Sequence, residues 1–336
     1  MVFLQEPKEM KPKSDPEELP LTRTAHCMLG VDNYVVIYGG KGPDNSVLDE
    51  IWAYDTLRRV WSHSELPIEV QKMCLYSSMC ACRTFVYIFG GTNYPLGDQV
   101  TNLLLQVDIR HFRWRILFEH SIETSDDIPQ PMFQSTIFYK DRGIFVVQPV
   151  SDTEKFASIY RFCLDTSSWK IITNFRHEPE VRFLGYGTIF NEKLFYFSRS
   201  DISINKFFEV GVYKMSMKMW GTSPTTSPTG EYPVDRENET WAFGGKYGYL
   251  CGGQRLDMES KRSFIEDVWR IDLETFEWKK LNLTPKQGRS HHAMALLNED
   301  CLYVFGGITS DDIPVKDGIK YVMNPPSKIC RRECFD

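Results

Sequence analysis

The sequence has no long hydrophobic run and no surplus of positive charge. No segment reaches 18 consecutive apolar residues, which excludes an ordinary transmembrane helix. The 39 Lys and Arg residues stand against 45 Asp and Glu, for a formal net charge of −6. A nucleic-acid-binding domain usually carries a basic patch or stripe. We therefore expect neither a membrane nor a nucleic acid as a partner.

Signals for secretion are also missing. The opening MVFLQEPKEMKPKSDPEELP is charged and rich in proline, and it has no apolar core of the kind found in signal peptides. The nine cysteines are odd in number and irregularly spaced, which fits a reducing compartment better than a disulfide framework. We expect a cytoplasmic or nuclear protein.

Motifs for catalysis and metal binding are scarce. A phosphate-binding loop needs GxxxxGK[ST] or GxGxxG ahead of a helix, and neither motif follows any glycine pair of this chain. Cys74, Cys80 and Cys82 lack zinc-type spacing, and Cys330 and Cys334 stand near the C-terminus without partners. We expect no enzymatic activity, no cofactor and no bound metal.

What the sequence does contain is an internal repeat. A doubled glycine follows a hydrophobic run four times, in YVVIYGG (Gly39 and Gly40), VYIFGG (Gly90 and Gly91), YLCGG (Gly252 and Gly253) and LYVFGG (Gly306 and Gly307). The steps between the doublets are about 51, 162 and 54 residues, so the middle step is close to three periods. Two further units without the doublet are predicted in that gap, at GIFVVQP (143–149) and KLFYFSR (193–199).

A second marker recurs in phase with the glycines. A tryptophan closes a strand-like segment roughly 20 to 25 residues after each doublet or its substitute, at Trp61, Trp114, Trp169, Trp220 and Trp278. Three of them follow an aspartate by six residues (Asp55, Asp108 and Asp272), as suits a tight hairpin turn. Each unit reads as four antiparallel strands, and six units of about 50 residues predict an all-β, six-bladed β-propeller.

Sterics explain the choice of these residue types. A turn without side chains lets the chain bend sharply where the blades crowd around the centre. A tryptophan on the outer strand is large enough to fill the widening wedge between two blades. Blades three and four carry Gln148-Pro149 and Ser198-Arg199 in place of the doublet, so we expect them to be the least regular.

These combined markers resemble the Kelch repeat over roughly residues 20–325. The resemblance implies a propeller over 21–325, with an N-terminal segment, 1–20, before it and a short tail, 326–336, after it. The last unit reaches NPP without a fourth strand, and a propeller must close its free edges. We expect residues 2–6 (VFLQE) to supply that strand, and the C-terminal tail is the alternative.

The loops that lead from the outer strand of one blade into the inner strand of the next share a composition. Arginines in four of the six loops converge on one end of the channel, where they either bind a carboxylate bidentately or pair with carboxylates of the fold itself. The first possibility predicts a pocket for an acidic or C-terminal carboxylate-bearing peptide. The predicted peptide-binding residues are Arg23, Tyr76, Ser77, Gln134, Arg182, Tyr186, Arg236, Trp241, Arg289, Ser290 and His291.

Two stretches, FGGTNYPLGDQVTNLLLQVDIRHFRW and IEDVWRIDLETFEWKKL, are similar to Kelch proteins understood to be substrate receptors of cullin-2 ubiquitin ligases that recognise C-terminal degrons. The resemblance implies the same role here, with elongin B/C and cullin-2 as partners. Such proteins continue past the propeller into an elongin-binding box and a cullin box, of which Ile329 and Cys330 in PPSKICRRECFD are the only hint. A Kelch scaffold or a cytoskeletal or signalling interaction protein without a ligase role is the alternative.

Overall fold

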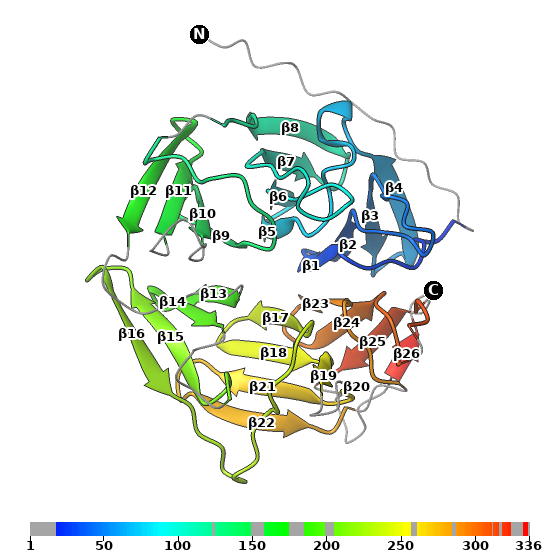
Figure 1. Ribbon diagram of the computed structural model, residues 1–336, viewed down its shortest axis with the longest axis vertical. Helices are drawn as coiled ribbons and strands as arrows, with labels where there is room; N and C mark the ends of the chain where they lie inside the picture. The colour runs from blue at the N-terminus through cyan, green and yellow to red at the C-terminus, as the bar shows by residue number, and fades with distance from the viewer. Residues whose placement is uncertain are drawn as a thin grey trace.

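Six four-stranded antiparallel sheets are arranged as a ring in the computed structural model of the chain (Figure 1). The structure describes residues 18–122, 125–148, 158–174, 185–198, 205–256, 261–283, 287–310, 312–315, 318–323 and 332–334. Within each sheet the strands lie side by side in the order in which the chain makes them, so every blade is a meander. The predicted six-bladed all-β propeller is confirmed.

The first three blades are built from twelve consecutive strands. Blade 1 consists of β1 (Cys27–Val31), β2 (Tyr34–Tyr38), β3 (Glu50–Asp55) and β4 (Val60–Glu65). Blade 2 consists of β5 (Ser78–Cys82), β6 (Phe85–Phe89), β7 (Leu104–Asp108) and β8 (Arg113–Phe118). Blade 3 consists of β9 (Thr136–Lys140), β10 (Gly143–Gln148), β11 (Ser158–Cys163) and β12 (Ser168–Asn174).

The second half of the ring follows the same plan, with one insertion. Blade 4 consists of β13 (Tyr186–Phe190), β14 (Lys193–Phe197), β15 (Glu209–Lys214) and β16 (Met219–Pro224). Blade 5 consists of β17 (Thr240–Gly244), β18 (Tyr247–Cys251), β21 (Val268–Asp272) and β22 (Glu277–Leu281). Blade 6 consists of β23 (Ala293–Leu297), β24 (Cys301–Phe305), β25 (Gly318–Val322) and β26 (Arg332–Cys334).

The insertion is a small hairpin in blade 5 that the repeat pattern did not predict. Strands β19 (Gln254–Leu256) and β20 (Arg262–Phe264) pair with each other between β18 and β21. A single 3-10 turn, η1 (Ile68–Val70), is the only helix among the described residues. No helix in this part of the chain is long and apolar enough to cross a membrane.

The predicted aspartate turns join the third and fourth strands of three blades. Asp55 Oδ1 accepts hydrogen bonds from the backbone N–H groups of Leu57 and Arg58 at 2.9 and 3.0 Å. The carboxylates of Asp108 and Asp272 likewise accept from backbone N–H groups of their own turns. These bonds satisfy backbone donors that the tight turn removes from the strand ladder.

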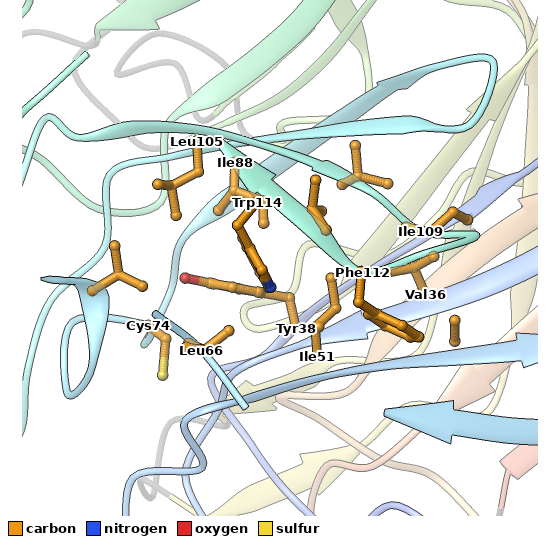
Figure 2. Packing of buried hydrophobic residues seen from close by; sticks show 14 of the residues in the cluster. Val36, Tyr38, Ile51, Leu66, Cys74, Ile88, Leu105, Ile109, Phe112 and Trp114 are labelled. Atoms are coloured by element: carbon orange, nitrogen blue, oxygen red, sulfur yellow. The ribbon is translucent and has the colours of Figure 1, made fainter. Parts of the chain in front are cut away.

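Six hydrophobic clusters hold the blades together, one at each blade interface. Figure 2 shows the cluster between blades 1 and 2, where Trp114 of β8 lies close to Tyr38 of blade 1. The repeated tryptophans all pack against the preceding blade, as the wedge argument predicts. They belong to the clusters between blades 6 and 1 (Trp61), 1 and 2 (Trp114), 2 and 3 (Trp169), 3 and 4 (Trp220) and 4 and 5 (Trp278).

The doubled glycines lie where the backbones of neighbouring blades come into close contact. Gly39 and Gly306 have φ angles of +62° and +70°, in the left-handed region that favours glycine. A Cβ atom on Gly306 would lie 2.5 Å from the carbonyl oxygen of Arg23 in blade 1, and one on Gly39 would lie 2.3 Å from that of Cys74 in blade 2. No side chain fits at either position, because the backbone of the next blade already occupies the space.

The last blade is closed from the C-terminus. Strand β26 pairs antiparallel with β25, with Tyr321 opposite Arg332, and thus takes the place that we expected residues 2–6 to fill. The closing strand is therefore the C-terminal alternative, and residues 2–6 lie outside the described residues. Side-chain packing joins blade 6 to blade 1, and the N–H group of Gly307 donates to the carbonyl oxygen of Arg23 at 2.9 Å.

Blades 3 and 4 keep all four strands although they lack the doublet. A register shift interrupts the β11–β12 pairing at Ile159 and Tyr160, but blade 2 has a similar shift at Leu104 and Leu105. Irregular pairing in the described strands is therefore not confined to blades 3 and 4. The segments that follow β10 and β14, 149–157 and 199–204, lie outside the described residues.

Candidate functional site

A cavity of about 960 Å³ lies where the inner strands of the six blades converge. Its lining comes from the first strand of each blade and the loop before that strand, from the end of β14 and Lys206 in blade 4, and from β19 of blade 5. All six blades contribute, through residues such as Ala25, Tyr76, Gln134, Tyr186, Asn238 and His291. Large concave sites of this kind are where ligands usually bind.

A ring of residues in an unusual backbone conformation surrounds this cavity. Five blades place a non-glycine residue with φ between +52° and +56° just before the first strand: Ala25, Tyr76, Gln134, Asn238 and His291. All five line the cavity. Positive φ is uncommon for residues other than glycine, and such residues often cluster at functional sites.

Backbone hydrogen bonds link this ring from blade to blade. The N–H group of Tyr76 donates to Ala25 O at 2.8 Å, and that of Gln134 donates to Tyr76 O at 2.7 Å. On the other side of the ring, His291 N–H donates to Asn238 O at 3.1 Å. Because backbone atoms make these bonds, the side chains at the same positions can vary and still line the cavity.

Aromatic side chains of blades 4 and 5 form one wall of the cavity. The ring of Tyr186 stacks on Trp241 at 6.1 Å, and Trp241 stacks on Phe197 at 4.4 Å. The hydroxyl of Tyr186 donates to Glu239 O at 2.8 Å. The Tyr186 side chain is 37% exposed to the cavity, but loss of water around its hydroxyl and the negative charge of Glu239 hold the pKa of that hydroxyl well above its usual range, so it remains a donor.

The charged part of the lining is balanced. It contains three basic and three acidic side chains, namely Lys206, Arg236, Arg255, Asp235, Glu237 and Glu239. Lys206 Nζ lies 2.7 Å from Glu239 Oε1 and also donates to Arg236 O. Arg255 is exposed on β19 and forms no ion pair with a described residue. The cavity therefore does not present a cluster of unpaired cations.

The predicted arginines serve the fold. Arg23 is 1% exposed, donates from Nη1 to Gly39 O at 2.9 Å and lies 2.6 Å from Glu50 Oε1. Arg236 repeats this arrangement with Gly252 O at 3.1 Å and with the carboxylate of Asp267. Each arginine thus binds the first glycine of the doublet in its own blade.

The third described arginine follows the same pattern, and a serine replaces it in blade 2. Arg289 Nη1 donates to Gly306 O at 3.4 Å, and Ser77 Oγ donates to Gly90 O at 3.0 Å. The expectation that arginine forks face a ligand is therefore corrected for Arg23, Arg236 and Arg289, because these guanidinium groups are buried against the glycine turns. Arg182 lies outside the described residues.

The structure brings most of the other predicted residues together. The predicted residues that line the cavity are Tyr76, Ser77, Gln134, Tyr186, Arg236, Trp241 and His291. Arg23, Arg289 and Ser290 do not belong to the lining, and the Ser290 hydroxyl donates to Gln254 Oε1 at 3.2 Å. The sequence argument missed Asn238, although it stands at the same loop position as Gln134 and His291.

Two further histidines line the cavity and are neutral. Burial, assisted by the charge of Arg23, lowers the pKa of His26 to about 3. Burial and Arg289 likewise lower the pKa of His292 well below its usual range. Within the described parts of the chain, no three His, Cys, Asp or Glu side chains are grouped closely enough to hold a metal ion.

Comparisons with known proteins agree with this architecture. A family model described as the KLHDC2/KLHL20/DRC7 Kelch-repeats domain matches residues 5–198. Kelch domain-containing protein 10 of Homo sapiens is 21% identical over 324 residues, covering 87% of this chain and 67% of that protein. Kelch domain-containing protein 1 of Homo sapiens is 25% identical over 312 residues, covering 88% of this chain and 65% of that protein.

A solved structure has the same fold. The structure titled "Structure of YjhT" aligns with a TM-score of 0.65 and 15% sequence identity, and the alignment covers 91% of this chain and 96% of that one. At this level of identity the match concerns the fold alone. The family match covers more than half of the chain, and its range includes the doublets at Gly39 and Gly90 and three wedge tryptophans, Trp61, Trp114 and Trp169. The chain belongs to the Kelch-repeat family of β-propellers.

Proposed function

We propose that this chain is a protein-interaction module that binds a peptide segment of its ligand in the central cavity. The observation that carries the proposal is the ring of five left-handed residues, which line the cavity while three backbone hydrogen bonds link them across blade boundaries. Such an arrangement holds the recognition residues on a rigid frame, which reduces the entropy lost on binding. The cavity volume of about 960 Å³ suits a short peptide end or loop.

The lining favours a peptide that is recognised through hydrogen bonds and aromatic contacts. Tyr76, Gln134 and His291 contribute polar groups, and the wall of Tyr186 and Trp241 contributes apolar surface. The buried arginines are bound to the glycine turns, so they give no support to a carboxylate clamp. If the ligand ends in a free carboxylate, Arg255 is the cation of the described lining that would meet it.

We further propose that the ligand is a substrate presented to a cullin-RING ubiquitin ligase. The support is the resemblance of FGGTNYPLGDQVTNLLLQVDIRHFRW and IEDVWRIDLETFEWKKL to Kelch proteins with that role. Affinity purification of the chain from cells, followed by immunoblotting for elongin B/C and cullin-2, tests this step. Recovery of a ligand without either partner would favour a scaffold, and it would leave the peptide-binding proposal intact.

Binding in the cavity is tested with a peptide pool and a variant of the ring. The double variant Tyr76→Asn and His291→Asn changes two side chains of the lining, and asparagine tolerates the left-handed conformation. We expect peptide capture to fall at least roughly tenfold, as is typical when interface anchors are removed. Thermal unfolding should change little, because the hydrogen bonds of the ring are made by the backbone.

The matched control is Lys218→Asn. Lys218 has a φ angle of +51° but lies in the turn between β15 and β16, outside the cavity lining. This variant should capture the pool as the unmodified chain does. Equal capture by the control and by the double variant would refute binding in the cavity. Sorting the captured peptides by their last residue decides between recognition of a C-terminus and recognition of an internal segment.

A further inference from the structure

One of the six blade interfaces lacks its wedge tryptophan. In five blades the tryptophan stands opposite the penultimate residue of the third strand, in the pairs Tyr54 and Trp61, Val107 and Trp114, Phe162 and Trp169, Tyr213 and Trp220, and Ile271 and Trp278. In blade 6 the equivalent residue is Tyr321, and the residue opposite is Arg332. The interface between blades 5 and 6 is therefore built without an indole from its outer strand.

A pocket of about 280 Å³ opens at this same interface. It is smaller than the roughly 300–1,000 Å³ of sites for drug-sized ligands, so its volume suits a single large side chain. Its lining residues, from blades 5 and 6, are Tyr247, Tyr249, Arg270, Lys279, Lys280, Leu281, Asn282, Leu283, Glu299, Asp300 and Met323. None of them lines the central cavity.

The wall formed by blade 5 is aromatic and basic. Tyr249 is buried on β18, and the guanidinium of Arg270 lies over the ring of Tyr247 at 4.1 Å. Lys279 is exposed on β22 and stands opposite Arg270, whereas Lys280 Nζ lies 5.7 Å from the ring of Trp269 on the face toward blade 4. An arginine held flat against an aromatic ring offers a second face to another ring.

The wall formed by blade 6 carries the opposite charge. Glu299 and Asp300 lie in the turn between β23 and β24, and Met323 follows β25. The basic and acidic groups are therefore separated on two walls, with apolar surface from Leu281 and Leu283 in the lining. Exposed Lys279 of β22 offers favourable contacts to acidic residues.

We propose that this pocket binds an aromatic side chain of a partner protein, in a segment where acidic residues flank the aromatic one. The aromatic ring supplies the apolar surface that a tryptophan supplies at the other five interfaces, and it packs beside Tyr249 and Arg270. The flanking carboxylates lie beside Lys279 of β22 and Arg270 of β21. This site is separate from the central cavity and does not depend on the proposed function.

Fluorescence polarisation with three labelled peptides tests the chemistry of the pocket. The probe is fluorescein-Gly-Gly-Glu-Trp-Glu-amide, and the comparison peptides replace the tryptophan by alanine or both glutamates by lysine. We expect the probe to bind and each comparison peptide to bind at least roughly fivefold more weakly, since one replacement removes the ring and the other reverses the charge. Equal binding of all three peptides would overturn the proposal.

Variants of the chain then locate the site. The variant Lys279→Glu should weaken binding of the probe roughly fivefold, and Asn282→Trp, which places an indole in the lining, should block it. The control Lys214→Glu makes the same charge change at an exposed residue of blade 4 and should bind normally. An equal loss in the control would overturn the proposal, because binding would then follow overall charge.

The central cavity provides the last comparison. The Tyr76→Asn and His291→Asn variant should bind the Glu-Trp-Glu probe as the unmodified chain does, even though it loses peptide binding in the central cavity. Loss of the probe in this variant, with retention in the Lys279 variant, would assign the peptide to the central cavity and refute the pocket. Thermal unfolding of every variant shows that the comparison is made between folded proteins.

Discussion

Arg23 Nη1 donates a hydrogen bond to the carbonyl oxygen of Gly39 at 2.9 Å, within a single blade and 16 residues along the chain. The same relation joins Arg236 to Gly252. A doublet turn exposes carbonyl groups at the place where neighbouring blades crowd together, and a buried carbonyl without a partner is destabilising. The arginine satisfies that carbonyl and is held in turn by Glu50.

Replacing Arg23 by methionine tests this role. Methionine keeps most of the apolar stem but removes the donor to Gly39 and the partner of Glu50. We expect a loss of about 2–4 kcal/mol in the free energy of unfolding, measured by urea denaturation. The control is Arg110→Met, because Arg110 pairs with Asp32 on the surface, and exposed ion pairs contribute little to stability, so that change should cost much less. Similar losses in both variants would contradict a special role for Arg23.

The second prediction separates backbone strain from close approach at the doubled glycine. Gly306→Ala places a Cβ atom 2.5 Å from Arg23 O at a φ of +70°, whereas Gly230→Ala has a similar φ of +73° and nothing within 4 Å. The Gly230 variant should lose about 1–2 kcal/mol from strain alone. The Gly306 variant should lose clearly more, because the backbone of blade 1 must move. Equal melting temperatures of the two variants would show that the blade contact is unimportant.

Much of the fold could be predicted because the blades repeat the same turns and the same packing. Four blades share the sharp glycine turn and five share the tryptophan wedge, so both markers recur in the sequence with a fixed period. The closing strand could not be predicted in the same way. Strand β26 is three residues long, and Arg332 stands in the register of the tryptophan, so the sequence carries no marker there. The β19–β20 hairpin is also outside the repeat and left no periodic signal.

The sequence predicted where the residues of the candidate site lie better than it predicted what each of them does. The loops before the first strands do surround the cavity, and Tyr76, Gln134 and His291 lie there. The role of Arg23 could not be read from the sequence, because its partner Glu50 lies 27 residues away and meets it only in the folded blade. The ring of residues with left-handed backbone conformation could not be predicted from the sequence for another reason. Its members have unrelated side chains, so only the backbone of the structure reveals their equivalence.

The third prediction concerns stability in acid. Burial lowers the pKa of His26 to about 3 from an ordinary value of 6.5, so the unfolded chain binds a proton at this residue between those values and the folded chain does not. Stability must therefore fall as the pH drops through this window, and His26 alone contributes on the order of 2–3 kcal/mol of that loss at about pH 4.5. His292, whose pKa burial also lowers, adds to it. Urea denaturation from pH 7 to pH 4.5 measures it. His26→Gln should flatten the curve, and an unchanged curve would contradict the assignment.

The last prediction concerns Cys163, which ends β11 where aspartates end the third strands of blades 1, 2 and 5. Hydrogen bonds from the Thr166 side chain and from backbone N–H groups of the turn lower the pKa of this thiol from 9.0 to about 7. Alkylation of Cys163 by iodoacetamide should therefore reach half of its maximal rate near pH 7, because the thiolate is the nucleophile. Thr166→Val removes the largest of these hydrogen bonds and should move the midpoint to higher pH. Cys80, whose pKa burial raises, should remain unmodified across this range, which mass spectrometry of the labelled peptides can check. A midpoint near 9 for Cys163 in the unmodified chain would show that the turn does not stabilise the thiolate.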